Sequence, residues 1–278
     1  MEFVYSAKNP DAPVAFASFG AMHSVFEIVV PGVSEQKARN VAGKAEAMVA
    51  AVEKKLNRHD PDSVFSKLDS SSGLATVEVD DEVFSILQFC EAFRKSTAGY
   101  FDIAALSISE IRPAYIMSPE KRTVSLAGQD LFLDAGGFGK GYALDMVRSM
   151  LEREGVDNAL MNFGDSSVTA LGHHPYGDCW KVETRSGGGS FRLKGSSLSV
   201  SGLRPDGIAH IVNPVDGTVV GNRGAVAVEG RSAFVCEVLS TALYAAPEAM
   251  RQAIMAAFGG YSYKVIKQDL KQWIGENL

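Results

Sequence analysis

The chain has 278 residues, a formal net charge of −6 and three cysteines. Hydrophobic residues make up 46% of it and charged residues 22%, which is the profile of an ordinary globular protein. This length corresponds to one large domain or two packed ones, and such a chain buries enough surface to fold without disulfides. Because it is mildly acidic and has no basic stripe, the sequence argues against a nucleic-acid partner.

The cysteines and the N-terminus bear on the cellular compartment. Cys90, Cys179 and Cys236 are far apart and form no C-x-x-C pair, so a zinc knuckle or a thioredoxin-type site is excluded and buried, reduced thiols are expected. The start of the chain lacks the basic and apolar parts of a secretory signal, and the run from Ala12 to Val30 contains too many polar residues to span a bilayer. We therefore expect a cytoplasmic location for the chain as given, and an exported form trimmed of its signal would read the same way.

Hydrophobic periodicity predicts five helices and many short strands. The helices are expected from a cap at Ser34 to Leu56 and over Asp81–Ser96, Tyr142–Glu154, Ala233–Leu243 and Glu248–Phe258. The strands are expected at Val25–Val30, Val77–Val79, Val124–Leu126, Leu131–Asp134, Ala159–Asn162, Ser167–Leu171, Trp180–Thr184, Phe191–Leu193, Leu198–Ser201, Ile208–Val212, Ala225–Val228 and Tyr261–Ile266, with a loop at Asn57–Gly73 and a turn at Ser186–Ser190. This mixed order favours an α+β fold over a doubly wound sheet. Since the chain has no repeat and no clear linker, residues 1–278 are expected to form a single unit.

A glycine-rich segment, Asp134-Ala-Gly-Gly-Phe-Gly-Lys-Gly-Tyr142, lies between a predicted strand and a predicted helix. Its backbone amides, the helix dipole and Lys140 could hold a phosphate. It is neither a Walker A loop nor a GxGxxG loop. A tight turn with a solvated lysine would explain the same pattern.

Three further patterns each allow a functional and a structural interpretation. Glu237 and Thr241 lie four residues apart on one helical face and suit a hard cation such as Mg²⁺. A Glu favoured by the helix dipole and a Thr bonding to its own backbone would explain the same pattern. His210 precedes a Pro/Asp/Gly turn, where it could move a proton or contact a phosphate, or be a satisfied strand histidine. Tyr100 and Asp102 could stack on a heterocycle and bind its polar edge, or be a core aromatic residue and a capping acid.

The order of these motifs resembles the ApbE family, the FAD:protein FMN transferases. The resemblance extends from about Phe19 to Phe258. It is carried by Ala21-Met-His-Ser24 (AMGT in the family), Leu56-Asn-Arg58 with Asp62–Leu68, Gly99–Asp102, Leu133–Tyr142 (DLGGIAKGYA), Asn162–Gly164, His210–Pro214 with Gly217, and Cys236–Ala242 (ADALSTA).

The resemblance implies two interlocked α/β lobes of the ApbE/T-fold-like type, with FAD bound between them. It also implies that FMN is transferred from FAD to a threonine of an acceptor protein, with release of AMP. Mg²⁺ would be held by Glu237, Thr241 and a backbone carbonyl near Ser166. The FAD contacts would come from Met22, Ser24, Tyr100, Asp102, Gly137, Lys140, Gly164 and His210. The base for the incoming hydroxyl would be His210 or, as a second choice, Asp165.

Several positions depart from the family pattern. Glu237 replaces an aspartate and adds one methylene, His23 replaces a glycine, Asp165 stands at the second glycine of G-G-D, and Asn213 replaces an aspartate. Because these changes gather around the expected catalytic face, two alternatives accompany the transferase. One is an FAD pyrophosphatase that gives FMN and AMP, and the other is an FAD-binding protein with impaired catalysis. The sequence specifies neither the acceptor nor an oligomeric state.

Overall fold

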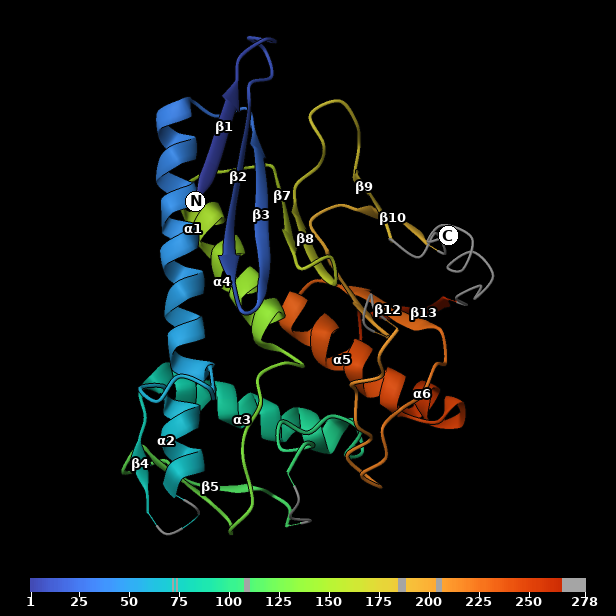
Figure 1. The fold of residues 1–278 in the computed structure, drawn as a ribbon. Coiled ribbons are helices and arrows are strands. Elements are labelled where there is room, and N and C mark those ends of the chain that lie inside the picture. The colour runs from blue at the N-terminus through green and yellow to red at the C-terminus, as the bar shows by residue number, and fades with distance from the viewer. Residues whose placement is uncertain (72, 74, 108–110, 185–188, 204–206, 267–278) are drawn as a thin grey trace.

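The structure is a computed structural model that describes residues 1–71, 73, 75–107, 111–184, 189–203 and 207–266. Its largest element is an eight-stranded antiparallel sheet (Figure 1). The strand order is β1-β2-β3-β7-β8-β11-β12-β13. These strands are β1 (Glu2–Ser6), β2 (Val14–Ala21), β3 (Ser24–Pro31), β7 (Ala159–Phe163), β8 (Ser167–Leu171), β11 (Ser197–Ser201), β12 (Ala225–Gly230) and β13 (Ser262–Ile266).

Three helices, α1 (Glu35–Leu56), α4 (Gly139–Arg153) and α5 (Ala233–Ala245), pack on one face of this sheet (Figure 1). α1 begins where Ser34 accepts the backbone N–H of Lys37, which satisfies one of the free donors of the first turn. Its buried stripe recurs at helical spacing and meets alternate inward side chains of the strands. The stripe consists of Ala38, Val41, Ala42, Ala45, Val49, Val52 and Leu56.

The opposite face of the sheet is covered by a hairpin of β9 (Trp180–Glu183) and β10 (Ser190–Leu193). Trp180 and Leu193 join Val168 and Leu198 in a separate buried cluster. Every residue of β8 is therefore buried, because helices lie on one side of it and the hairpin on the other.

A smaller sheet of order β4-β6-β5 lies at the far end of α1. Its strands are β4 (Val77–Glu78), β6 (Thr123–Leu126) and β5 (Tyr115–Ser118), and it packs with α2 (Val64–Ser71) and α3 (Asp81–Ser96). One apolar cluster runs from the large sheet through α1 and α4 to the small sheet. The last helix, α6 (Glu248–Met255), follows α5 and packs against it. The α+β prediction is confirmed.

Several predicted boundaries are wrong, each for an identifiable reason. Residues 57–73 are not all loop, because Phe65 and Leu68 bury one side of α2. Leu131–Asp134 is not a strand, since the amide of Leu133 donates to the Asp69 side chain instead of to a strand. Ile208–Val212 forms only an isolated bridge between Val212 and Val219. α4 begins three residues before the predicted Tyr142, at Gly139. Strands β1, β2 and β5 were not predicted, and residues 186–188 of the expected turn lie outside the described residues.

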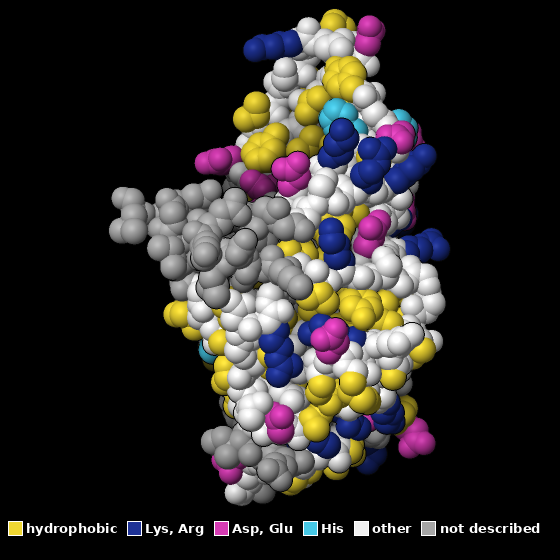
Figure 2. Space-filling view, turned by 90° about the vertical axis from the view of Figure 1, so that its right-hand side faces the viewer, with side chains coloured by type: hydrophobic (Ala, Val, Ile, Leu, Met, Phe, Trp, Pro, Cys, Tyr) yellow, Lys and Arg dark blue, Asp and Glu magenta, His cyan; other side chains and the backbone are white. Residues whose placement is uncertain are grey.

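The three cysteines are buried and free, as expected. Burial raises the pKa of the Cys90 and Cys236 thiols, so both stay protonated and unreactive at neutral pH. No described helix is both long and apolar enough to cross a membrane. On the face shown in Figure 2, Lys and Arg side chains are mixed with Asp and Glu, and the described residues form no basic stripe there.

Candidate functional site

The glycine-rich segment forms a tight turn that leads directly into α4. The Asp134 carboxylate accepts the N–H of Gly136 at 2.8 Å, and the carbonyl of Ala135 accepts the N–H of Gly139 at 2.7 Å. The N-cap residue, Phe138, provides no side-chain hydrogen bond to the helix. The carbonyl of Ala135 therefore accepts the first N–H of the helix, and the positive end of the helix dipole faces the site.

Two glycines allow other elements to approach this turn closely. A Cβ on Gly141 would collide with the backbone of Ala233, where α5 begins. A Cβ on Gly137 would lie 3.3 Å from the Phe101 ring and 3.8 Å from the hydroxyl of Thr241. The glycines therefore serve close packing of α4 on α5 as well as the turn itself.

Glu237 of α5 reaches across to the start of α4. Its Oε2 accepts the N–H of Gly141 at 2.5 Å, and its Oε1 lies 2.7 Å from the Nζ of Lys140. The Glu237 side chain is only 5% exposed, so the ion pair and the amide compensate a buried charge. One turn later on α5, the hydroxyl of Thr241 lies 3.3 Å from that of Ser201 on β11.

The tip of the β2–β3 hairpin enters the same site. Ala21 pairs with Ser24, so Met22 and His23 alone form the turn. A Cβ on Gly139 would lie 3.8 Å from the sulfur of Met22. A Cβ on Gly164, which has a φ of 65°, would collide with the hydroxyl of Ser24.

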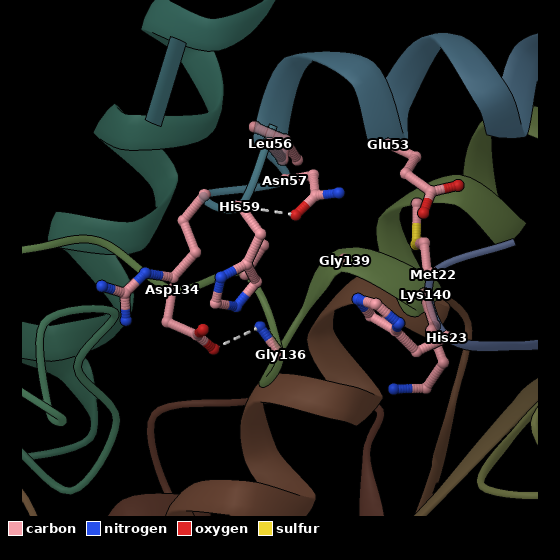
Figure 3. A pocket seen from close by; sticks show the side chains of 12 residues that line it. Met22, His23, Glu53, Leu56, Asn57, His59, Asp134, Gly136, Gly139 and Lys140 are labelled. Carbon is pink, nitrogen blue, oxygen red and sulfur yellow. Dashed lines mark hydrogen bonds between the residues drawn. The ribbon is translucent and has the colours of Figure 1, made fainter. Parts of the chain in front are cut away.

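A cavity of about 170 Å³ opens between this hairpin tip, the glycine turn and the end of α1. In Figure 3, His23 lies beside Lys140, while Glu53 and Asn57 extend from α1 on the opposite wall. His59 lies near Asp134 on the remaining side. The lining therefore combines carboxylates, an amide and two imidazoles with the N-terminal end of α4.

Seven of the sequence-predicted residues are brought together by direct or near contacts. They are Met22, Ser24, Gly137, Lys140, Gly164, Glu237 and Thr241. The rest of the predicted set lies in other surroundings. Tyr100 is half-buried and packs between two apolar clusters. Asp102 binds Arg112 at 2.5 Å and accepts the N–H of Ala104, so both of its carboxylate oxygens are engaged by residues nearby in the sequence.

Three more predicted residues lie at the end of β7 and in the segment after β11. Asp165 is exposed, has a φ of 56° and accepts a hydrogen bond from Asn162 at 3.1 Å. The carbonyl of Ser166 accepts the N–H of Val200 at 2.8 Å, next to Ser201. His210 is exposed. The roles assigned to these three residues stay predictions.

Sequence reasoning missed part of the site. The amide of Gly141 and the hydroxyl of Ser201 contact the proposed metal residues, and Glu53, Asn57 and His59 line the cavity. The available signal was the Leu56-Asn-Arg58 patch, which belongs to the resemblance but was not assigned a role.

The residues fit a divalent cation in donor chemistry. Glu237 and Thr241 offer a carboxylate and a hydroxyl from one face of α5, which are ligands that Mg²⁺ accepts. The buried carboxylate already attracts a cation, the ammonium of Lys140. Within the described residues, no group of three or more His, Cys, Asp or Glu side chains could hold a metal ion. Any further ligands must therefore be carbonyls, hydroxyls, water or substrate.

Known proteins are similar to this chain in sequence and in fold. A curated relative from Klebsiella pneumoniae (strain 342), named FAD:protein FMN transferase, is 21% identical and covers 97% of this chain and 90% of its own. A relative of the same name from Escherichia coli (strain K12) is 19% identical, over 96% of this chain and 89% of its own.

Solved structures agree on the fold. The ApbE protein of Thermotoga maritima superposes with a TM-score of 0.77 at 21% identity, covering 95% of this chain and 99% of that one. The flavinyl transferase ApbE of Pseudomonas stutzeri superposes with a TM-score of 0.74 at 19% identity, covering 95% of this chain and 98% of that one. The sequence profile of the ApbE family matches residues 22–262. The chain therefore belongs to the ApbE family.

Proposed function

We propose that this protein is a flavin transferase that uses FAD, moves its FMN portion to a threonine hydroxyl of an acceptor protein and releases AMP. The curated relatives carry the name FAD:protein FMN transferase and match nearly the whole chain. The observation that carries the proposal is the contact of Lys140 and the first turn of α4 with Glu237, beside Thr241. This arrangement gathers anion-binding and cation-binding groups at one place, as pyrophosphate chemistry requires.

FAD would place its pyrophosphate at the N-terminus of α4, where the helix dipole and the ammonium of Lys140 favour negative charge. The cavity of about 170 Å³ is smaller than the roughly 300–1,000 Å³ of pockets that enclose a whole ligand. It would therefore receive one part of the dinucleotide. The oxygens of Glu53, Asn57 and Asp134 on its wall suit the hydroxyl and amino donors of a nucleoside.

In the reaction, the acceptor oxygen forms a bond to the phosphorus of the FMN portion, and the bond from that phosphorus to the bridging oxygen breaks. AMP leaves with the bridging oxygen, and the proton of the hydroxyl passes to a base, for which His210 and Asp165 are the candidates. Such a transfer depends on positioning and charge stabilisation more than on a strong base. Lys140 stabilises negative charge, and Glu237 holds its ammonium in place.

Mg²⁺ would be held by Glu237 and Thr241, with the carbonyl of Ser166 as a further candidate. When bound, it supplies charge neutralisation at the pyrophosphate and at the leaving phosphate. Glu237 is one methylene longer than the usual aspartate, and this length lets one carboxylate reach both Lys140 and the amide of Gly141.

The test is transfer by purified protein supplied with FAD, Mg²⁺ and a candidate acceptor, followed by released AMP and by flavin fluorescence on the denatured acceptor. Glu237→Ala and Thr241→Ala should each reduce transfer by about 100-fold or more, because each removes a proposed ligand of the Mg²⁺ that would neutralise developing negative charge. Thr241→Ser retains a hydroxyl and should keep most activity. Glu248→Ala removes an exposed carboxylate on α6 and is the matched control.

The other possible outcomes would each contradict a stated part of this proposal. AMP and FMN released at the same rate without acceptor would identify an FAD pyrophosphatase. Tight FAD binding with no AMP would identify a binding protein and reject both enzymes. An unchanged dependence of activity on Mg²⁺ concentration in both alanine variants would reject the metal assignment alone.

A further inference from the structure

The hairpin that enters the site has an unfavourable backbone. Met22 and His23 form its two-residue turn with φ values of 48° and 55°. Such turns favour glycine and asparagine, because other side chains are strained at positive φ. The imidazole of His23 is therefore carried at a backbone conformation that favours glycine. Strain of this kind persists where the surrounding structure enforces it, and it concentrates at functional sites.

The His23 ring is available to a ligand. It is exposed, lines the cavity and lies beside the side chain of Lys140 (Figure 3). Among the residues that the structure describes, it has no hydrogen-bond partner and no ion-pair partner. An imidazole in this position can donate an N–H to a bound molecule.

The permanent cations of the cavity are already compensated. Lys140 pairs with Glu237 at 2.7 Å, and Arg58 lies 3.5 Å from Asp69 while stacking on the Phe132 ring. A cation paired with a carboxylate offers a pyrophosphate less net positive charge than a free one, so a donor that no carboxylate uses would add to the binding. The amides of Gly139 and Gly141 at the start of α4 are engaged as well, by the Ala135 carbonyl and by Glu237. His23 therefore supplies a side-chain donor that no group of the described residues already uses.

We propose that His23 is a substrate-binding residue that donates a hydrogen bond to the pyrophosphate of the dinucleotide held at the N-terminus of α4. This inference rests on the proposed function, since it assigns one contact of the same site. The inference is specific to this chain, because His23 replaces the glycine of the AMGT motif of the family. The strained turn directs the imidazole ring toward the phosphates, and a glycine at position 23 would lack this N–H donor.

The experiment measures the binding of FAD, ADP and adenosine by calorimetry to the wild-type chain, His23→Gly and His23→Asn. For His23→Gly we expect the Kd of FAD and of ADP to rise about 10-fold or more, as for a lost hydrogen bond to a charged group. The Kd of adenosine should not change. Asn tolerates positive φ and keeps an N–H donor, so His23→Asn should restore part of the affinity. Asp130→Gly is the control, since Asp130 has a φ of 59° in an exposed turn outside the cavity lining.

Neither glycine variant should lower Tm, because glycine adopts positive φ without strain. Equal FAD affinity in wild type and His23→Gly would overturn the inference while leaving the proposed function intact. An equal loss for adenosine would overturn the assignment to the pyrophosphate. A wild-type chain that binds neither FAD nor ADP would overturn both proposals.

Discussion

Asp145 connects α4 to the start of α5, two helices that lie far apart in sequence. Its carboxylate accepts the hydroxyl of Ser232 at 2.5 Å and the amides of Ala233 and Phe234 at 2.8 and 3.1 Å. These donors belong to the first turn of α5, where no helix carbonyl can receive them. Burial raises the pKa of Asp145, although the three hydrogen bonds oppose the shift. The residue therefore fixes the position of α5, and with it Glu237.

Asp145→Ala should lower the free energy of unfolding by about 1–3 kcal/mol, because buried donors lose their acceptor. Asp145→Asn keeps one acceptor and no charge to desolvate, so it should fall between wild type and alanine. Urea denaturation at pH 7 measures both. An alanine variant as stable as wild type would show that α5 is positioned by packing alone.

At the scale of elements, the contact between α4 and α5 builds the site. α4 begins at Gly139 and α5 supplies Glu237 and Thr241, so the distance between the helices sets the distance between their functional groups. Gly141 lies at the closest approach, where a Cβ would come within 2.7 Å of the carbonyl carbon of Ala233. Neither Gly141 nor Ala233 can move aside easily, because both belong to the backbone of a helix.

Gly141→Ala should therefore separate the helices and cost about 1–3 kcal/mol, as overpacking does in well-packed interiors. It should also weaken FAD binding, since Glu237 loses its alignment with Lys140. Gly43→Ala is the matched control, because a Cβ there meets no atom within 4 Å and helix propensity favours alanine. A Gly141→Ala variant that keeps both stability and FAD affinity would contradict this account of the interface.

At the scale of the whole molecule, a charged network joins the end of α1 to the start of α3 and to α4. Lys55 binds Asp80 at 2.6 Å and also Glu82, which accepts the hydroxyl of Tyr142 at 2.9 Å. Burial lowers the pKa of Lys55, but the two carboxylates outweigh it and the net pKa is raised. Burial raises the pKa of Asp80, but Lys55 and the amide of Val83 outweigh it and the net pKa is lowered.

The sign of each shift defines a pH window. The lowered pKa of Asp80 contributes stability above its unfolded value, near pH 4, and this is lost as pH falls through the folded value. The raised pKa of Lys55 contributes stability below about pH 10 that is lost at higher pH. Lys55→Met should therefore reduce the urea midpoint at pH 7. It should also reduce the loss of stability that the wild-type chain shows between pH 5 and pH 3. Arg39→Met, which breaks the exposed pair with Glu35, should change neither. Equal pH profiles for Lys55→Met and wild type would rule out a role for the network in acid unfolding.

Sequence patterns were informative wherever local physics decides the structure. The cap at Ser34, the stripe of α1 and the bounds of α3 were predicted correctly, because capping and helical periodicity act within a few residues. Leu131–Asp134 and Ile208–Val212 have strand-like composition without a neighbouring strand to pair with. Pairing is a tertiary property, so composition alone could not exclude them.

By itself, the sequence determined that the chain folds as α+β and that its ordered motifs match the ApbE family, because these depend on residue types and spacing. Only the tertiary structure decided that Lys140 meets Glu237, that Asp102 is engaged by Arg112 and that His23 lies in the cavity at positive φ. The physical reason is that these contacts join residues from different elements, and the packing of α4 on α5 and on the β2–β3 hairpin sets their distances.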